Sequence, residues 1–152
     1  MRIVQIFEEL ARDHQKMKTF MARIADDDES EVRPALWSDL KRLLFAHAKA
    51  EEAVFYPNLI DDERAHLQAH AALRDHQEIE KLALAIDEMG LEGEIWRPLF
   101  RQLRTRLERH IEEEELDLFR LSRRHVSRDE AEEMGEIFRD MKSEVYEELS
   151  AI

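Results

Sequence analysis

Residues 36–54, LWSDLKRLLFAHAKAEEAV, carry an apolar stripe with two polar side chains inside it. Hydrophobic residues recur here at spacings of three and four, the pattern of one face of an α-helix. His47 and Glu51 occupy two positions on that face, and residues four apart lie one turn above each other. The stretch therefore predicts a helix that directs an imidazole and a carboxylate into a protein core.

Three further stripes of the same kind each contain a histidine, and the last also contains a glutamate four residues later. Burying these groups without partners would cost several kcal/mol each, whereas a cation satisfies ring nitrogens and carboxylate charge together. The pattern predicts a metal site with six ligands: His14, His47, Glu51, His76, His110 and Glu114. Glu80 repeats the four-residue spacing after His76 and is an additional candidate, as a ligand or as a partner of one, but a solvated or half-buried glutamate is the favoured interpretation.

An internal repeat links the two halves of the chain. The tetrapeptide Arg-Asp-His-Gln occurs at residues 12–15 and again at 74–77, and a His-x-x-x-Glu pair follows each copy. The second histidine lies 33 residues after the first in one half and 34 in the other. The matching offsets predict two helical hairpins that face each other across a pseudo-dyad, each supplying three ligands.

The ligand count predicts two metal ions. Six side chains suffice for two histidines per ion and two bridging carboxylates, and nitrogen and oxygen ligands without sulfur suit iron, manganese or zinc. A solvent bridge would then leave one open position on each octahedral ion, which a purely structural site does not need.

Other polar residues are weaker candidates. His66 and His70 are four apart and could clasp an ion, but they lie off the ligand stripe by helical-wheel counting. Glu115 could replace Glu114 if the helix were locally distorted. His125 stands among arginines, where a solvated linker residue is expected.

Composition excludes several classes of function. The 152 residues suffice for one domain with a substantial core, and the absence of cysteine excludes disulfides and thiolate metal sites. A formal charge of −13 opposes binding to nucleic acid. No apolar run approaches the length needed to span a membrane, and the early acidic residues argue against a signal peptide. We therefore expect a cytoplasmic protein.

Proline, glycine and capping residues divide the chain into five predicted helices, at residues 3–25, 34–56, 62–89, 98–123 and 127–150. Gly90 is expected to be a left-handed cap, and Ser127 with Glu130 forms a capping box. We expect residues 1–124 to form the metal-binding bundle. Residues 125–152 then form an amphipathic helix, packed on the bundle or in an oligomer interface such as a homodimer.

Over about residues 5–124, the chain resembles the hemerythrin-like, or HHE cation-binding, family. The likeness is carried by Asp13-His14, His47-x-x-x-Glu51-Glu52 ending at Tyr56-Pro57, Asp75-His76, and His110-x-x-x-Glu114. The resemblance implies an all-α fold, an up-down four-helix bundle with a di-iron centre in its core, here with an additional C-terminal helix. Members of the family bind oxygen, sense oxygen or iron, respond to nitric oxide, or decompose peroxide.

The sequence departs from the oxygen carriers of that family. Carriers pair a fifth histidine with the one on the third helix, whereas Ala72 and Glu80 stand four residues from His76 here. The fourth-helix motif of carriers ends in aspartate five residues on, not in glutamate four residues on. These differences favour a reactive or sensing member with two histidines for each metal ion.

We therefore expect a non-haem di-iron protein that reacts with or binds oxygen, peroxide or nitric oxide, with catalase-like or peroxidatic turnover as one form. The alternatives are an oxygen- or iron-sensing or iron-binding module without turnover, and a metal-free acidic helical interaction protein. The open site should face a small, dry, apolar pocket without a cationic group. Its expected lining is Leu10, Met17, Leu43, Leu44, Leu73, Ile79 and Leu107.

Overall fold

A computed structural model describes residues 4–26 and 31–150, which form helices and contain no strand. The all-α class is confirmed. The elements in chain order are α1 (Ile6–Asp26), α2 (Arg33–Val54), α3 (Pro57–Ile60), α4 (His66–Met89), α5 (Arg97–Glu113), η1 (Glu114–Leu118), α6 (Phe119–Arg123) and α7 (Arg128–Ser150). Residue 3, where the first helix was expected to begin, lies outside the described residues.

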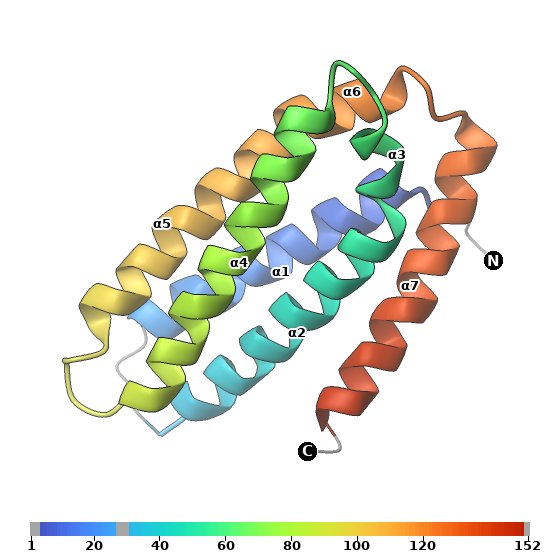
Figure 1. Cartoon of the computed structure of the whole chain (residues 1–152). Helices are drawn as coiled ribbons and strands as arrows, with labels where there is room; N and C mark the ends of the chain where they lie inside the picture. The colour runs from blue at the N-terminus through green and yellow to red at the C-terminus, as the bar shows by residue number, and fades with distance from the viewer. Residues whose placement is uncertain (1–3, 27–30, 151–152) are drawn as a thin grey trace.

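Helices α1, α2, α4 and α5 form the predicted four-helix bundle (Figure 1). Helix α1 packs against α2, and α4 packs against α5, so each half of the sequence repeat forms one hairpin. Helix α7 lies outside this bundle, alongside α2 and α1. The short α3 and α6 close the end of the bundle where α2 and α5 finish.

Two hydrophobic clusters fill the bundle and leave a polar layer between them. On α1, Leu10 belongs to one cluster and Met17 to the other, with His14 between them. On α4, Ala72 and Ile79 flank His76 in the same way. The buried apolar side chains on both sides hold each polar residue at a fixed level along the bundle.

Two helix boundaries differ from the predicted ones, at the end of α2 near Pro57 and at the start of α4 near Asp62. Helix α2 ends at Val54, and a separate turn, α3, begins at Pro57, which suits the first turn of a helix. Helix α4 begins at His66, not at residue 62, because the Asp62 carboxylate accepts a hydrogen bond from the backbone of Arg64. The cap at Gly90 has φ +78° as expected, but its ψ of 166° is extended, so it is not an αL cap.

The predicted helix at 98–123 does not keep α-helical geometry throughout. It changes at Glu114 into the π-helical segment η1 and returns to α-helix at Phe119. At the junction, the Phe119 amide donates to the Glu114 carbonyl, five residues earlier. Such insertions are frequent at functional sites because they rotate side chains relative to a regular helix.

The last helix is fixed at its start and packs closely on α1. The predicted capping box is confirmed: the Glu130 amide donates to Ser127 Oγ at 3.1 Å, and the Ser127 amide to Glu130 Oε1 at 3.3 Å. A Cβ atom at Gly135 would lie 2.4 Å from the Val4 carbonyl oxygen and 2.9 Å from the Ile6 amide nitrogen. Glycine therefore permits the close approach of α7 to the start of α1.

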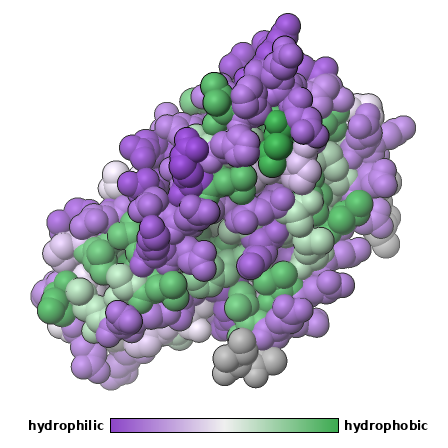
Figure 2. Space-filling view, in the orientation of Figure 1, coloured by the Kyte–Doolittle hydropathy of each residue, from purple (hydrophilic) through white to green (hydrophobic). Residues whose placement is uncertain are grey.

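Hydrophilic side chains cover most of the face shown in Figure 2, as the charge of −13 leads one to expect. Among the described helices, none combines the length and the apolar composition that a membrane crossing would require.

Candidate metal centre

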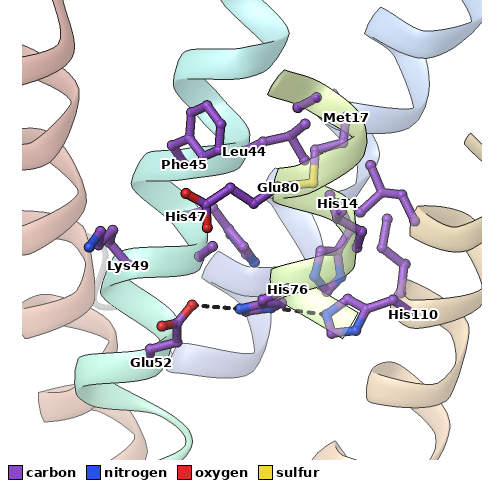
Figure 3. A pocket seen from close by; sticks show the side chains of 15 residues that line it. His14, Met17, Leu44, Phe45, His47, Lys49, Glu52, His76, Glu80 and His110 are labelled. Carbon is purple, nitrogen blue, oxygen red and sulfur yellow. Dashed lines mark hydrogen bonds and ion pairs between the residues drawn. The ribbon is translucent and has the colours of Figure 1, made fainter. Parts of the chain in front are cut away.

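The structure brings together all six side chains predicted as metal ligands. Figure 3 shows the four imidazoles reaching one cavity from four helices. The ligand atoms form two groups, each with all its atoms within 4.8 Å of one another. The groups are His14, His47, Glu51 and Glu114, and Glu51, His76, His110 and Glu114. Each group therefore has two histidines of its own and shares both glutamates.

Each glutamate faces both groups with a different oxygen. Glu51 Oε2 lies 3.6 Å from His47 Nε2, and Glu51 Oε1 lies 3.1 Å from His76 Nε2. Glu114 repeats this arrangement, with Oε1 3.3 Å from His14 Nε2 and Oε2 3.5 Å from His110 Nε2. The two carboxylates thus span the space between the two histidine pairs.

Each histidine is held from behind by a carboxylate on its other ring nitrogen, Nδ1. The pairs are His14 with Glu115 at 2.7 Å, His47 with Asp13 at 2.8 Å, His76 with Glu52 at 2.8 Å, and His110 with Asp75 at 3.4 Å. Because a carboxylate only accepts, each Nδ1 carries a hydrogen, and a ring that gives up its second proton to a metal ion presents its Nε2 lone pair inward. Carboxylate partners of this kind orient histidines that bind metals.

These four carboxylates follow the sequence repeat, although our sequence reasoning assigned none of them this role. Asp13 and Asp75 precede a histidine of the repeat, and each holds the histidine of the next long helix. Glu52 and Glu115 follow the shared glutamates, and each holds a histidine of the opposite hairpin. The signal that could have identified them was their fixed place beside the ligands in both halves.

Four buried atoms facing the centre have no hydrogen-bond partner among the described residues. They are His14 Nε2, His47 Nε2, Glu51 Oε2 and Glu114 Oε1. All four belong to the first group, and leaving such atoms unsatisfied in a protein interior costs free energy. A cation bound among them would satisfy two lone pairs and two carboxylate oxygens at once. The donor set therefore fits a metal ion.

Tyr56, which sequence reasoning placed only at a helix end, is buried inside the second group. Its hydroxyl oxygen lies 2.9 Å from Glu51 Oε1, 2.7 Å from Glu114 Oε2 and 3.1 Å from His76 Nε2. Burial and the two neighbouring carboxylates raise the pKa of Tyr56 well above its ordinary value. The phenol therefore keeps its proton and donates it to a shared carboxylate.

The carboxylates also favour protonation of the histidines when no metal is bound. Burial by itself lowers the pKa of His47, but Glu51 and Asp13 outweigh burial and raise this pKa to about 9. His76 is likewise raised to a pKa of about 9 by Glu51 and Glu52. A metal ion that binds these rings must displace their protons.

A cavity of about 100 Å³ opens beside the four histidines. Four of the seven expected apolar residues line it: Met17, Leu44, Ile79 and Leu107. The other three do not line it: Leu43 belongs to the same hydrophobic cluster as the four lining residues, Leu10 belongs to the second cluster, and Leu73 packs against that second cluster. The cavity is therefore small and largely apolar, as predicted.

Charged residues stand on the wall of this cavity, contrary to the expectation that no cation is present. Lys49 lines it with an exposed side chain, although it lies between the buried residues His47 and Ala50 of α2. Glu80 also lines it and is exposed, outside both groups of ligand atoms (Figure 3). A ligand role for Glu80 stays a prediction.

The structure also places the weaker metal-ligand candidates and the remaining histidine. Among the described residues, neither His66 nor His70 joins a group of three metal-ligating side chains. Glu115 hydrogen-bonds to His14 from within η1, so the helix is distorted there while Glu114 keeps its place in both groups. His125 is an exposed linker residue, as expected, and it also hydrogen-bonds to the Asn58 carbonyl oxygen at 2.8 Å and pairs with Asp62 at 3.2 Å, which ties the last linker to the end of the bundle.

The family model and the solved structure that match this chain belong to the same family. Residues 5–122 match the model of the hemerythrin HHE cation-binding domain. The fold is similar to the crystal structure of a hemerythrin HHE cation-binding domain-containing protein from Mycobacterium kansasii, with a TM-score of 0.84 and 22% sequence identity. The match covers 95% of this chain and 89% of that one. No curated protein matches the chain.

Proposed function

Because the chain belongs to the hemerythrin HHE cation-binding family, we propose that it holds two iron ions that react with oxygen, peroxide or nitric oxide. One observation carries the proposal: Glu51 and Glu114 each direct one oxygen to each of two histidine pairs. An arrangement of two neutral nitrogens per group and two shared carboxylates suits a bridged pair of ions. Manganese or zinc would fit the same donor types.

Different residues would have different roles at such a centre. His14 and His47 would hold one ion, His76 and His110 the other, and Glu51 with Glu114 would bridge them. Bound iron would supply redox chemistry and polarise a ligand at an open position. Tyr56 holds a proton at its hydroxyl oxygen, 2.7 Å from Glu114 Oε2, and can donate it where negative charge accumulates.

The size of the cavity limits which ligands can reach the metal centre. A volume of about 100 Å³ beside the histidines accommodates a diatomic molecule or peroxide and excludes bulky organic substrates. Met17, Leu44 and Ile79 give the cavity an apolar wall, and the exposed Lys49 and Glu80 also line it. With two histidines for each ion, we expect oxidation of the reduced centre by oxygen or peroxide, with catalase-like or peroxidatic turnover, and no lasting oxygen adduct.

A sensing role is the second candidate. Lys142 of α7 contacts Asp13, which holds His47, so a change at the centre has a direct path to the C-terminal helix. A metal-free interaction protein is disfavoured by the four unsatisfied buried atoms at the centre. A cytoplasmic location and a dimer through α7 remain part of the proposal.

Stopped-flow absorbance tests the reactive function. Iron-loaded protein is reduced without oxygen and mixed with oxygen or peroxide, while oxygen evolution is followed in parallel. We expect fast oxidation in the wild type, its loss in Glu51→Ala and Glu114→Ala, and a smaller effect in Glu80→Ala. A stable, reversible oxygen adduct would favour carriage, and no reaction of the loaded protein with either oxidant would favour sensing.

A further inference from the structure

The two histidine pairs differ in what stands behind them, although their ligands are related by the pseudo-dyad. His47 is held by Asp13, whose side chain is 1% exposed. The equivalent His110 is held by Asp75, whose side chain is 18% exposed, and the contact is longer, 3.4 Å against 2.8 Å. The other two histidines, His14 and His76, are both held by partly exposed glutamates, 32% and 41% exposed, so the contrast lies between His47, held by a dry carboxylate, and His110, held by a wetter one.

Helix α7 produces this difference. Lys142 Nζ donates to both oxygens of Asp13, at 2.8 and 3.1 Å, and its side chain is 18% exposed. The matching cation on the other side, Arg106, lies 3.7 Å from Asp75 and is 36% exposed. Phe138, fully buried one turn before Lys142, packs edge-on against the His47 ring with a centroid distance of 5.5 Å. No described helix covers the second pair in this way, because α7 lies along α1 and α2 alone.

We propose that Lys142 is a positioning residue for the metal centre, an inference that rests on the proposed two-ion site. Lys142 fixes the orientation of the Asp13 carboxylate, and that carboxylate fixes the orientation of the His47 ring. The ion held by His14 and His47 is therefore bound more tightly than the ion held by His76 and His110. The C-terminal helix thus makes a symmetric set of ligands into two unequal metal positions.

A buried carboxylate without its countercharge would rotate toward water, and the rotation would release the Nδ1 hydrogen bond of His47. Outer partners of metal-binding histidines change metal affinity by about 10–100-fold when they are removed. The contact between Arg106 and Asp75 is weaker than the contact between Lys142 and Asp13, because solvent screens it.

The chain offers matched controls. Arg139, also on α7, pairs with the buried carboxylate of Glu9 on α1 but contacts no predicted ligand. Arg139→Met therefore removes an ion pair between the same two helices without touching His47. Arg106→Met removes the counterpart of Lys142 on the second pair. Lys142→Met removes the charge and keeps most of the apolar stem.

The test is an anaerobic titration of metal-free protein with cobalt(II), followed by visible absorbance and by competition with a chromophoric chelator. In Lys142→Met, we expect the first equivalent to bind about 10–100-fold more weakly and with an altered spectrum, while the second keeps its spectrum. Arg139→Met and Arg106→Met should each keep both affinities within about fivefold and both spectra unchanged.

Four results would overturn the inference. Equal effects of Lys142→Met and Arg139→Met would reduce Lys142 to a structural contact, as would an unchanged first-equivalent spectrum in Lys142→Met. An equal or larger effect of Arg106→Met would contradict the inequality of the two positions. A wild-type titration that ends below two equivalents would instead contradict the two-ion proposal itself, and the inference with it.

Discussion

The Tyr56 hydroxyl lies 2.7 Å from Glu114 Oε2, inside the cluster where a second metal ion is proposed. It also lies 2.9 Å from Glu51 Oε1, so the single phenolic hydrogen can be donated to either shared carboxylate. Tyr56 comes from the turn between α2 and α3, directly before Pro57, the first residue of α3. The residue that ends a helix therefore also completes the polar layer.

Tyr56→Phe should destabilise the metal-free protein by about 1–3 kcal/mol, because the buried pair of carboxylates loses the one phenolic hydrogen bond it receives. Urea unfolding of the chelator-treated protein at neutral pH measures this. Tyr146→Phe is the matched control, since the Tyr146 ring keeps its stacking against Arg42 in the variant. Equal stability of Tyr56→Phe and wild type would show that the phenol does not satisfy Glu51 and Glu114.

Metal-free protein should become less stable as pH rises from about 6.5 to about 10. The histidine pKa is about 6.5 in an unfolded chain, and Asp75 with Glu114 overcomes burial to raise the pKa of His110 to about 10. The folded state then binds more protons than the unfolded state across this interval, so its stability is fully present below pH 6.5 and is lost above. Unfolding free energies at several pH values test this, and a flat or rising curve would contradict it.

Metal binding should show the opposite dependence on pH. Imidazoles must lose protons to bind an ion, and the pKa values of about 9 for His47 and His76 set the competition. Affinity should therefore rise between pH 6.5 and 9, with release of protons on loading. Chelator competition at three pH values, with a dye to count released protons, measures both effects. Affinity that does not change with pH would exclude these histidines as ligands.

Gly135→Ala should destabilise the protein by about 1–3 kcal/mol, although alanine ordinarily favours a helix. The new Cβ would lie 2.4 Å from the Val4 carbonyl oxygen, a backbone atom that cannot move aside cheaply. Glu136→Ala on the exposed side of α7 is the control and should change stability by less than about 0.5 kcal/mol. Thermal melts compare the two, and a higher melting temperature for Gly135→Ala would contradict the packing of α7 on α1.

Periodicity predicted the four bundle helices and brought His14, His47, Glu51 and the other ligand candidates into one core. It succeeded because a polar residue within an apolar stripe stands out whatever the details of packing. Asp13 and Glu52 could not be recognised in the same way. They lie beside the stripe, where most acidic residues are solvated, and their role depends on how neighbouring helices are turned.

Tyr56 and η1 were missed for a different physical reason. A tyrosine before a proline ordinarily indicates a helix end, and its reach into the centre depends on the path of the turn after Val54. A π-helical segment has no strong signature in a single sequence, since it depends on packing at Glu114 and Phe119. Both features arise from tertiary contacts that local patterns do not encode.

The most direct measurement is the number of metal ions per chain in protein loaded with iron without oxygen, desalted and analysed by elemental analysis. The account predicts about two irons in the wild type and in Glu80→Ala, and fewer than two in Glu51→Ala and in Glu114→Ala, because each removes an oxygen from both groups. A folded wild type with no bound metal, or variants of Glu51 and Glu114 that keep two irons, would contradict it.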